Sequence, residues 1–188
     1  SLYPNHINFE QLESVPYADP VPTGVYSSKD MDFSRGMAFA CKVFYSQGRA
    51  VTWFNSVLKA LKINATSFFA DFEEFQQCNN CSFEVDFDGE KAGHKAIEKL
   101  QLLFLEQKFE EKNKSHLFAA VNDIVRINGA FSRCSFEGTE EELELSYNPE
   151  DLLSPYSLNI ADFTENVAME SSAIRIFDTD EGPDSKFI

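Results

Sequence analysis

Residues 138–147 read Gly-Thr-Glu-Glu-Glu-Leu-Glu-Leu-Ser-Tyr, and this stretch decides the fold class. After the Gly-Thr turn, apolar Leu143, Leu145 and Tyr147 alternate with polar residues. A period of two is typical of a β-strand with one buried face and one face in water. Apolar residues also occur at even spacing in 130–136. The two segments together predict a β-hairpin.

The rest of the chain alternates between helical and strand patterns. Strand periodicity recurs at 83–88 and near 173–177, whereas helical spacing of apolar residues fills most of the remainder. We expect Asn128-Gly129 to end a helix. The predicted helices are 34–46, 49–63, a short helix carrying Phe68, Phe69, Phe72 and Phe75, then 90–112, 115–127 and a single turn that begins at Asn148-Pro149.

This order of elements predicts an α+β fold. Helices come first, and strands interrupted by two helices follow, which is typical of a mainly antiparallel sheet packed against helices. We expect four or five strands in that sheet. The predicted organisation is an extended, Pro-rich arm at 1–30, a single α+β domain at 31–177 and an acidic flexible tail at 178–188.

Charge is distributed unevenly along the chain. Residues 1–70 carry 5 acidic and 6 basic side chains, whereas residues 71–188 carry 26 acidic and 10 basic side chains, a net charge of −16. A charge of this size repels nucleic acids and anionic membranes and attracts basic protein surfaces. We therefore expect a basic protein partner, with no direct binding to nucleic acid or to a membrane.

Composition indicates a folded protein with a core rich in aromatic rings. The chain has 19 Phe in 188 residues, and each aromatic side chain buries roughly 150–250 Å².

No stretch approaches the ~18 apolar residues of a membrane helix. Four cysteines in a domain with a large apolar core do not suggest a disulfide scaffold, so we expect a cytoplasmic protein.

Two short motifs raise the question of a metal site. Residues 84–89 place carboxylates at alternate positions before a glycine, as a calcium loop does, but Lys95 stands where the closing Glu is needed. Cys78 and Cys81 have the spacing of half a zinc site or of a redox pair. The remaining candidate ligands match no standard zinc finger, so we predict no metal, while a structural zinc at these cysteines stays open.

No motif in the sequence identifies a reaction. The three histidines are not accompanied by a recognisable nucleophile pattern, and no phosphate-binding Gly-rich loop or His-Glu-x-x-His is present. We therefore predict that the chain is not an enzyme and binds no cofactor.

The helix predicted at 90–112 has two apolar stripes. One contains Ile97 and Leu100, and Leu102, Leu105 and Phe109 lie roughly opposite. A helix that is apolar on two sides must be covered on two sides. The second stripe therefore either packs inside the domain or forms an interface with another copy of the chain.

The hypothesis that accommodates these observations is an acidic inhibitor of a basic partner, of the kind represented by immunity proteins and by DNA mimics. The alternatives are a subunit that assembles into a homo-oligomer and a metal enzyme that uses carboxylates. Rigid strands hold charge at fixed spacing, so the predicted partner-binding carboxylates lie on strands; they are Glu84, Asp86, Asp88, Glu140, Glu142 and Glu144.

Overall fold

The computed structural model describes residues 27–78 and 92–188. The chain divides into two compact units, residues 1–35 and 36–188. Helix α2 (Ser28–Cys41) begins in the first unit with a reciprocal cap: the Asp30 N–H donates to Ser27 Oγ, and the Ser27 N–H donates to Asp30 Oδ2. The predicted arm at 1–30 lies almost entirely outside the described residues.

The second unit is a mixture of helices and a small sheet. The described residues contain seven α-helices and one three-stranded antiparallel sheet, so the α+β class is confirmed, and the predicted four or five strands are not. After α2 the elements are η1 (Lys42–Gln47), η2 (Ala50–Thr52), α3 (Phe54–Leu61), α4 (Ala65–Cys78), α5 (His94–Glu111), η4 (Ser115–Leu117), α6 (Phe118–Glu137), β1 (Glu141–Leu145), α7 (Pro149–Leu153), η5 (Pro155–Leu158), α8 (Ile160–Asn166), β2 (Ser172–Thr179) and β3 (Gly182–Phe187).

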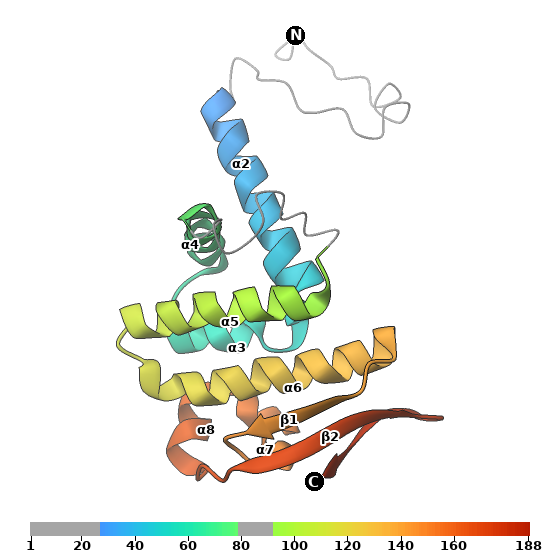
Figure 1. Cartoon of the computed structure of the whole chain (residues 1–188). Helices are drawn as coiled ribbons and strands as arrows, with labels where there is room; N and C mark the ends of the chain where they lie inside the picture. The colour runs from blue at the N-terminus through green and yellow to red at the C-terminus, as the bar shows by residue number, and fades with distance from the viewer. Residues whose placement is uncertain (1–26, 79–91) are drawn as a thin grey trace, which may run out of the picture. The chain divides into compact units, whose positions relative to one another are not determined.

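Helix α5 lies at the centre of this unit. It contacts α6 on one side and η1 on another, and α6 in turn contacts all three strands (Figure 1). Leu105 and Phe109 are fully buried in the chain's own core, and Leu102 is partly buried against it. Of the two alternatives for the second apolar stripe, packing inside the domain is therefore the one that the burial of Leu105 and Phe109 supports.

The phenylalanines build the core between these helices. The Phe44 ring is buried, and its centroid lies 4.8 Å from that of Phe68, 4.9 Å from that of Phe72 and 6.1 Å from that of Phe104. All three contacts are edge-to-face, which is a preferred arrangement for ring quadrupoles. The high Phe content thus fills the space between η1, α4 and α5.

The strand at 141–145 has the inward face that the alternation predicted. In the pairing of β1 with β2, Leu143 lies opposite Ile174 and Glu142 lies opposite Arg175. Leu143, Leu145 and Tyr147 are buried, whereas Glu142 and Glu144 are exposed. The strand at 141–145 and its inward face are therefore confirmed, and so is the strand predicted near 173–177.

The other half of the predicted hairpin is helical. Residues 130–136 belong to α6, which continues through Asn128-Gly129 without a break. Ala130 and Cys134 are also four residues apart, which suits one face of a helix as well as it suits a strand. Gly129 lies inside this helix, and Glu98 of α5 packs in the space that a side chain at position 129 would fill.

The segment 178–188, which was predicted to be an acidic flexible tail, instead contains the end of β2 and all of β3. Only β2 borders β3 among the described residues. Ile188 N donates to Ala173 O, so the even-numbered residues of β3 form the backbone hydrogen bonds to β2. The odd-numbered residues of β3 therefore direct their backbone groups to the edge of the sheet that faces away from β2. There Pro183 has no N–H, and the Ser185 N–H donates to Asp184 Oδ1, so this edge is protected against further pairing.

Candidate functional site

The residues that the sequence singled out are only partly within the described part of the chain. Glu84, Asp86 and Asp88 lie outside the described residues, and so does Cys81. Within residues 27–78 and 92–188, no three or more His, Cys, Asp or Glu side chains gather in a group that would hold a metal ion. The described candidates for partner binding are Glu140, Glu142 and Glu144.

These three glutamates lie on or beside β1, on the face of the sheet that points away from α6. Glu142 and Glu144 are exposed, whereas Glu140 Oε2 accepts a hydrogen bond from Arg175 Nη2 at 2.7 Å. Lys186 lies opposite Arg175 in the register, and its ammonium is 5.7 Å from the centroid of the Phe177 ring. The face therefore carries both signs of charge, and Glu140 is already paired.

A buried ionic cluster that the sequence did not predict holds α5, α6 and β1 together. Arg133 is buried, and its Nη1 donates to Glu98 Oε2 at 2.6 Å. Its Nη2 donates to Glu141 Oε2 at 3.0 Å, and its Nε donates to the other oxygen of the same carboxylate. Lys95 Nζ also reaches Glu141, at 2.5 Å. Because every charge in the cluster has a partner, it is a structural element.

His94 completes this cluster as a neutral side chain. Its Nδ1 lies 2.9 Å from Arg133 Nη1 and accepts a hydrogen bond from it. Its Nε2 lies 3.3 Å from the Gly48 carbonyl oxygen and donates a hydrogen bond to it. Burial and the nearby Arg49 lower the pKa of His94 to about 4. With both ring nitrogens occupied by protein groups, His94 fixes the junction of η1 with α5 and offers no free nitrogen for catalysis.

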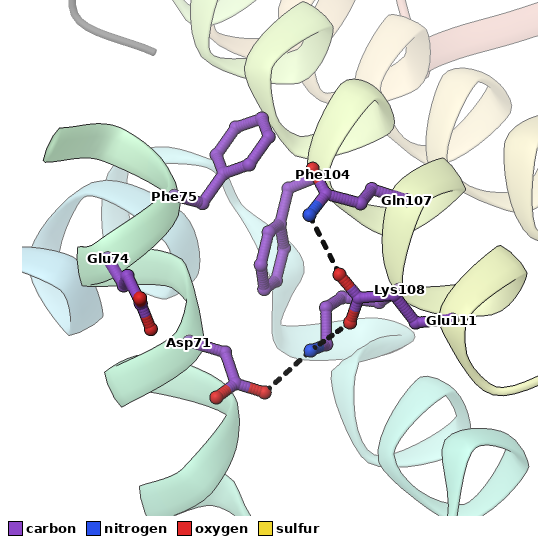
Figure 2. A pocket seen from close by; sticks show the side chains of 7 residues that line it. All are labelled: Asp71, Glu74, Phe75, Phe104, Gln107, Lys108 and Glu111. Atoms are coloured by element: carbon purple, nitrogen blue, oxygen red, sulfur yellow. Dashed lines mark hydrogen bonds and ion pairs between the residues drawn. The ribbon is translucent and has the colours of Figure 1, made fainter. Parts of the chain in front are cut away.

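A pocket of about 270 Å³ opens between α4 and α5. Figure 2 shows the rings of Phe75 and Phe104 between the two helices, with an ion-pair cluster beside them. In that cluster Lys108 Nζ lies 2.8 Å from Asp71 Oδ2 and 2.6 Å from Glu111 Oε2. The remaining lining residues are Glu74 and Gln107, whose Nε2 donates to Glu111 Oε1.

Lys108 and Glu111 keep their charges near neutral pH. Burial opposes the positive charge of Lys108, but hydrogen bonds to Asp71 and Glu111 outweigh it and raise the pKa of its ammonium. Hydrogen bonds from Lys108 and Gln107 lower the pKa of Glu111. A general acid or base works best with a pKa near the working pH. The Lys108–Glu111 pair is therefore suited to electrostatic binding rather than to proton transfer.

Sequence reasoning missed this pocket for a simple reason. Phe75 and Phe104 were predicted to lie in the apolar faces of helices. Lys108 lies on a helix for which only the two apolar stripes were considered as contact surfaces. One signal was present: Lys108 and Glu111 are three residues apart, so a helix places them on the same face. Nothing in the sequence indicates that Asp71, 37 positions earlier, meets them.

Comparisons with protein-family models, with curated proteins and with solved structures find no match to this chain. None of the helices in the described ranges combines the length and the apolar character that crossing a bilayer requires. The charges and the geometry of the chain itself are therefore the basis for proposing a function.

Proposed function

We propose that this chain is a non-enzymatic acidic binding protein, which recognises the basic surface of a partner protein and blocks it. Immunity proteins against nuclease toxins and DNA-mimicking inhibitors work in this way. The observation that carries the proposal is the net charge of −16 in residues 71–188, together with the exposure of Glu142 and Glu144 on one strand.

The strand holds the carboxylates of Glu142 and Glu144 at a fixed spacing. Outward-facing residues on a strand are two positions apart, a separation of about 6.8 Å. Because β1 is paired with β2 and packs on α6, the carboxylates of Glu142 and Glu144 project from a rigid backbone. Fixed negative charges of this kind steer a basic partner and raise its association rate. Glu140 contributes less, because Arg175 already neutralises it.

The pocket between α4 and α5 supports the same function. Its lining holds three carboxylates and one ammonium, which give a formal charge of −2. Excess negative charge at a surface opening favours positively charged ligands.

The test is affinity capture of the partner from the cells in which the chain is made, followed by kinetic measurement with the purified pair. We expect a basic protein, an association rate that falls steeply with salt, and inhibition of the partner's activity on binding. The variant Glu142→Lys/Glu144→Lys should lower the association rate. It should unfold within a few degrees of the parent, since exposed substitutions change stability by about 0.5 kcal/mol each.

The matched control is Glu106→Lys/Glu110→Lys, which changes the net charge equally at exposed positions of α5. This control should retain most of the association rate. A captured partner as acidic as this chain, or an association rate unchanged between low and moderate salt, contradicts the proposal. Equal losses in the two variants contradict the role of β1.

A further inference from the structure

Strand β1 forms one edge of the sheet, and part of its backbone is unpaired. Ala173 O accepts a hydrogen bond from Ile188 N, so Ala173 directs its backbone groups to β3 and away from β1. Glu144 lies opposite Ala173 in the register, and successive residues of an antiparallel strand alternate between its two edges. Glu142 and Glu144 therefore direct their backbone groups to the free edge of β1, whereas Leu143 pairs with β2.

Side chains of α6 cover only the end of this free edge. Arg126 Nη1 donates to Glu144 O at 2.8 Å, and the Ser146 N–H donates to Asp123 Oδ2 at 2.5 Å. In the part of the chain that the structure describes, no group bonds the N–H of Glu144 or either backbone group of Glu142. These three neighbouring backbone groups are therefore open to a further strand.

The two edges of the sheet differ in what they exclude. Pro183 and the Asp184 side chain protect the outer edge of β3, whereas β1 contains no proline and no side chain that bonds its free N–H groups. Two copies that paired antiparallel through β1 would set Glu142 opposite Glu144 of the other copy, and like charges directly opposite are destabilising. The edge of β1 is thus closed to a second copy and suited to a strand of opposite charge.

We infer that β1 accepts an extended segment of the basic partner as a further antiparallel strand, with an arginine or lysine opposite each of Glu142 and Glu144. The inference rests on the proposed function for the origin of this segment, and it specifies how the segment is held. When a peptide adds to the edge of a sheet, backbone hydrogen bonds supply affinity, and the side chains at alternate positions supply specificity.

The geometry of the sheet sets the sequence pattern of the added segment. Residues that exchange hydrogen bonds with Glu142 and Glu144 place their side chains on the same outward face as these glutamates, where basic groups form cross-strand ion pairs. The residue between them lies opposite Leu143 and faces the side of the sheet that packs on α6. An apolar, β-branched residue suits that position. The expected pattern is therefore basic, apolar, basic.

The first measurement is amide hydrogen exchange in the full chain, followed by NMR. In the free chain, protection of the Glu142 and Glu144 amides should be at least about tenfold weaker than that of the Leu143 and Leu145 amides, which are bonded to β2. If the glutamate amides are protected as well as the leucine amides, the edge is already occupied by the chain or by a second copy, and the inference is wrong.

The second measurement is a titration with the peptide acetyl-Arg-Val-Arg-Val-Arg-amide at constant ionic strength. We expect saturable shifts of the Glu142 and Glu144 amides, with a dissociation constant in the millimolar range, and slower exchange of both amides. The amide of Ser185, on the protected edge of β3, should not shift. Shifts that are confined to other elements overturn the inference.

Two N-methylated forms of this peptide are a matched pair, because they have the same charge and the same composition. N-methylation of the central arginine removes a donor to β1 and should weaken binding at least about threefold. N-methylation of a valine removes an N–H that faces away from β1, and it should leave binding within about 1.5-fold. Equal binding of the two forms shows that charge alone holds the peptide, and it overturns the inference.

The outcome is separable from that of the proposed function. If the peptide adds to β1 as described and no basic partner is found, strand addition stands and the inhibitor function fails. If a basic partner is captured and the two methylated peptides bind equally, the function stands and this inference fails.

Discussion

Replacement of Gly129 by alanine tests how α5 and α6 pack together. A Cβ atom at this position would overlap the Glu98 carboxylate, with its Cδ at 3.1 Å, and would lie 3.0 Å from Arg133 Nη1. Glu98 and Arg133 are both buried, so the carboxylate has no room to move without leaving its partner. The clash therefore acts directly on the buried ion pair.

Two opposing effects set the magnitude. In a helix interior, Ala is about 1 kcal/mol more favourable than Gly. Against this, separating a buried ion pair costs about 3–5 kcal/mol, because it leaves an uncompensated charge. We therefore expect Gly129→Ala to lower the free energy of unfolding by about 2–4 kcal/mol.

Urea denaturation followed by fluorescence measures this change, because Trp53 is the chain's single tryptophan and is buried. Gly93→Ala is the control: its Cβ would meet nothing within 4 Å, and it should change stability by less than about 1 kcal/mol. In a Glu98→Ala background, Gly129→Ala should lose most of its cost. A Gly129→Ala variant that is more stable than the parent by about 1 kcal/mol would refute the packing described for this junction.

Three further measurements test the fold and the ionic cluster. The pKa of His94 is about 4 in the folded chain and near 6.5 when unfolded, so the unfolded state binds more protons between these values. The contribution of His94 to the free energy of unfolding should be complete above about pH 6.5 and should fall by about 2–4 kcal/mol as the pH drops towards 4. If His94→Asn leaves the pH dependence of unfolding unchanged, this prediction is wrong. Leu145→Ala should cost about 2–5 kcal/mol and Glu144→Ala at most about 0.5 kcal/mol in chemical denaturation, and equal costs would show that the strand register is wrong. Phe109→Ala should cost about 3–5 kcal/mol at all protein concentrations, whereas a loss that appears only as dissociation of an oligomer would restore the interface reading.

The sequence by itself determined those elements whose pattern is local. The period of two at 141–147 set both the strand and its buried face, because adjacent residues on a strand point to opposite sides. Asn148 and Pro149 began the short helix α7 as expected, since an Asn cap and a proline in the first turn satisfy that helix end without help from distant residues.

Patterns that suit two structures were not decided by the sequence. Even spacing over 130–136 is compatible with a strand and with a helix, and in the structure this stretch belongs to α6, where Glu98 packs against Gly129. Likewise, the apolar stripe of Leu105 and Phe109 would suit an interface as well as a core. Its burial depends on how α5 sits against its neighbours, which local periodicity does not encode.

The sites depended on tertiary structure most of all. Arg133 meets a carboxylate 35 positions earlier in the chain, and Lys108 meets Asp71 across two helices. Coulombic attraction needs proximity, and proximity between distant residues arises only when the core fixes the crossing of the helices. The sequence therefore specified how much charge the chain carries, and the fold decided which charges are buried as pairs and which are exposed.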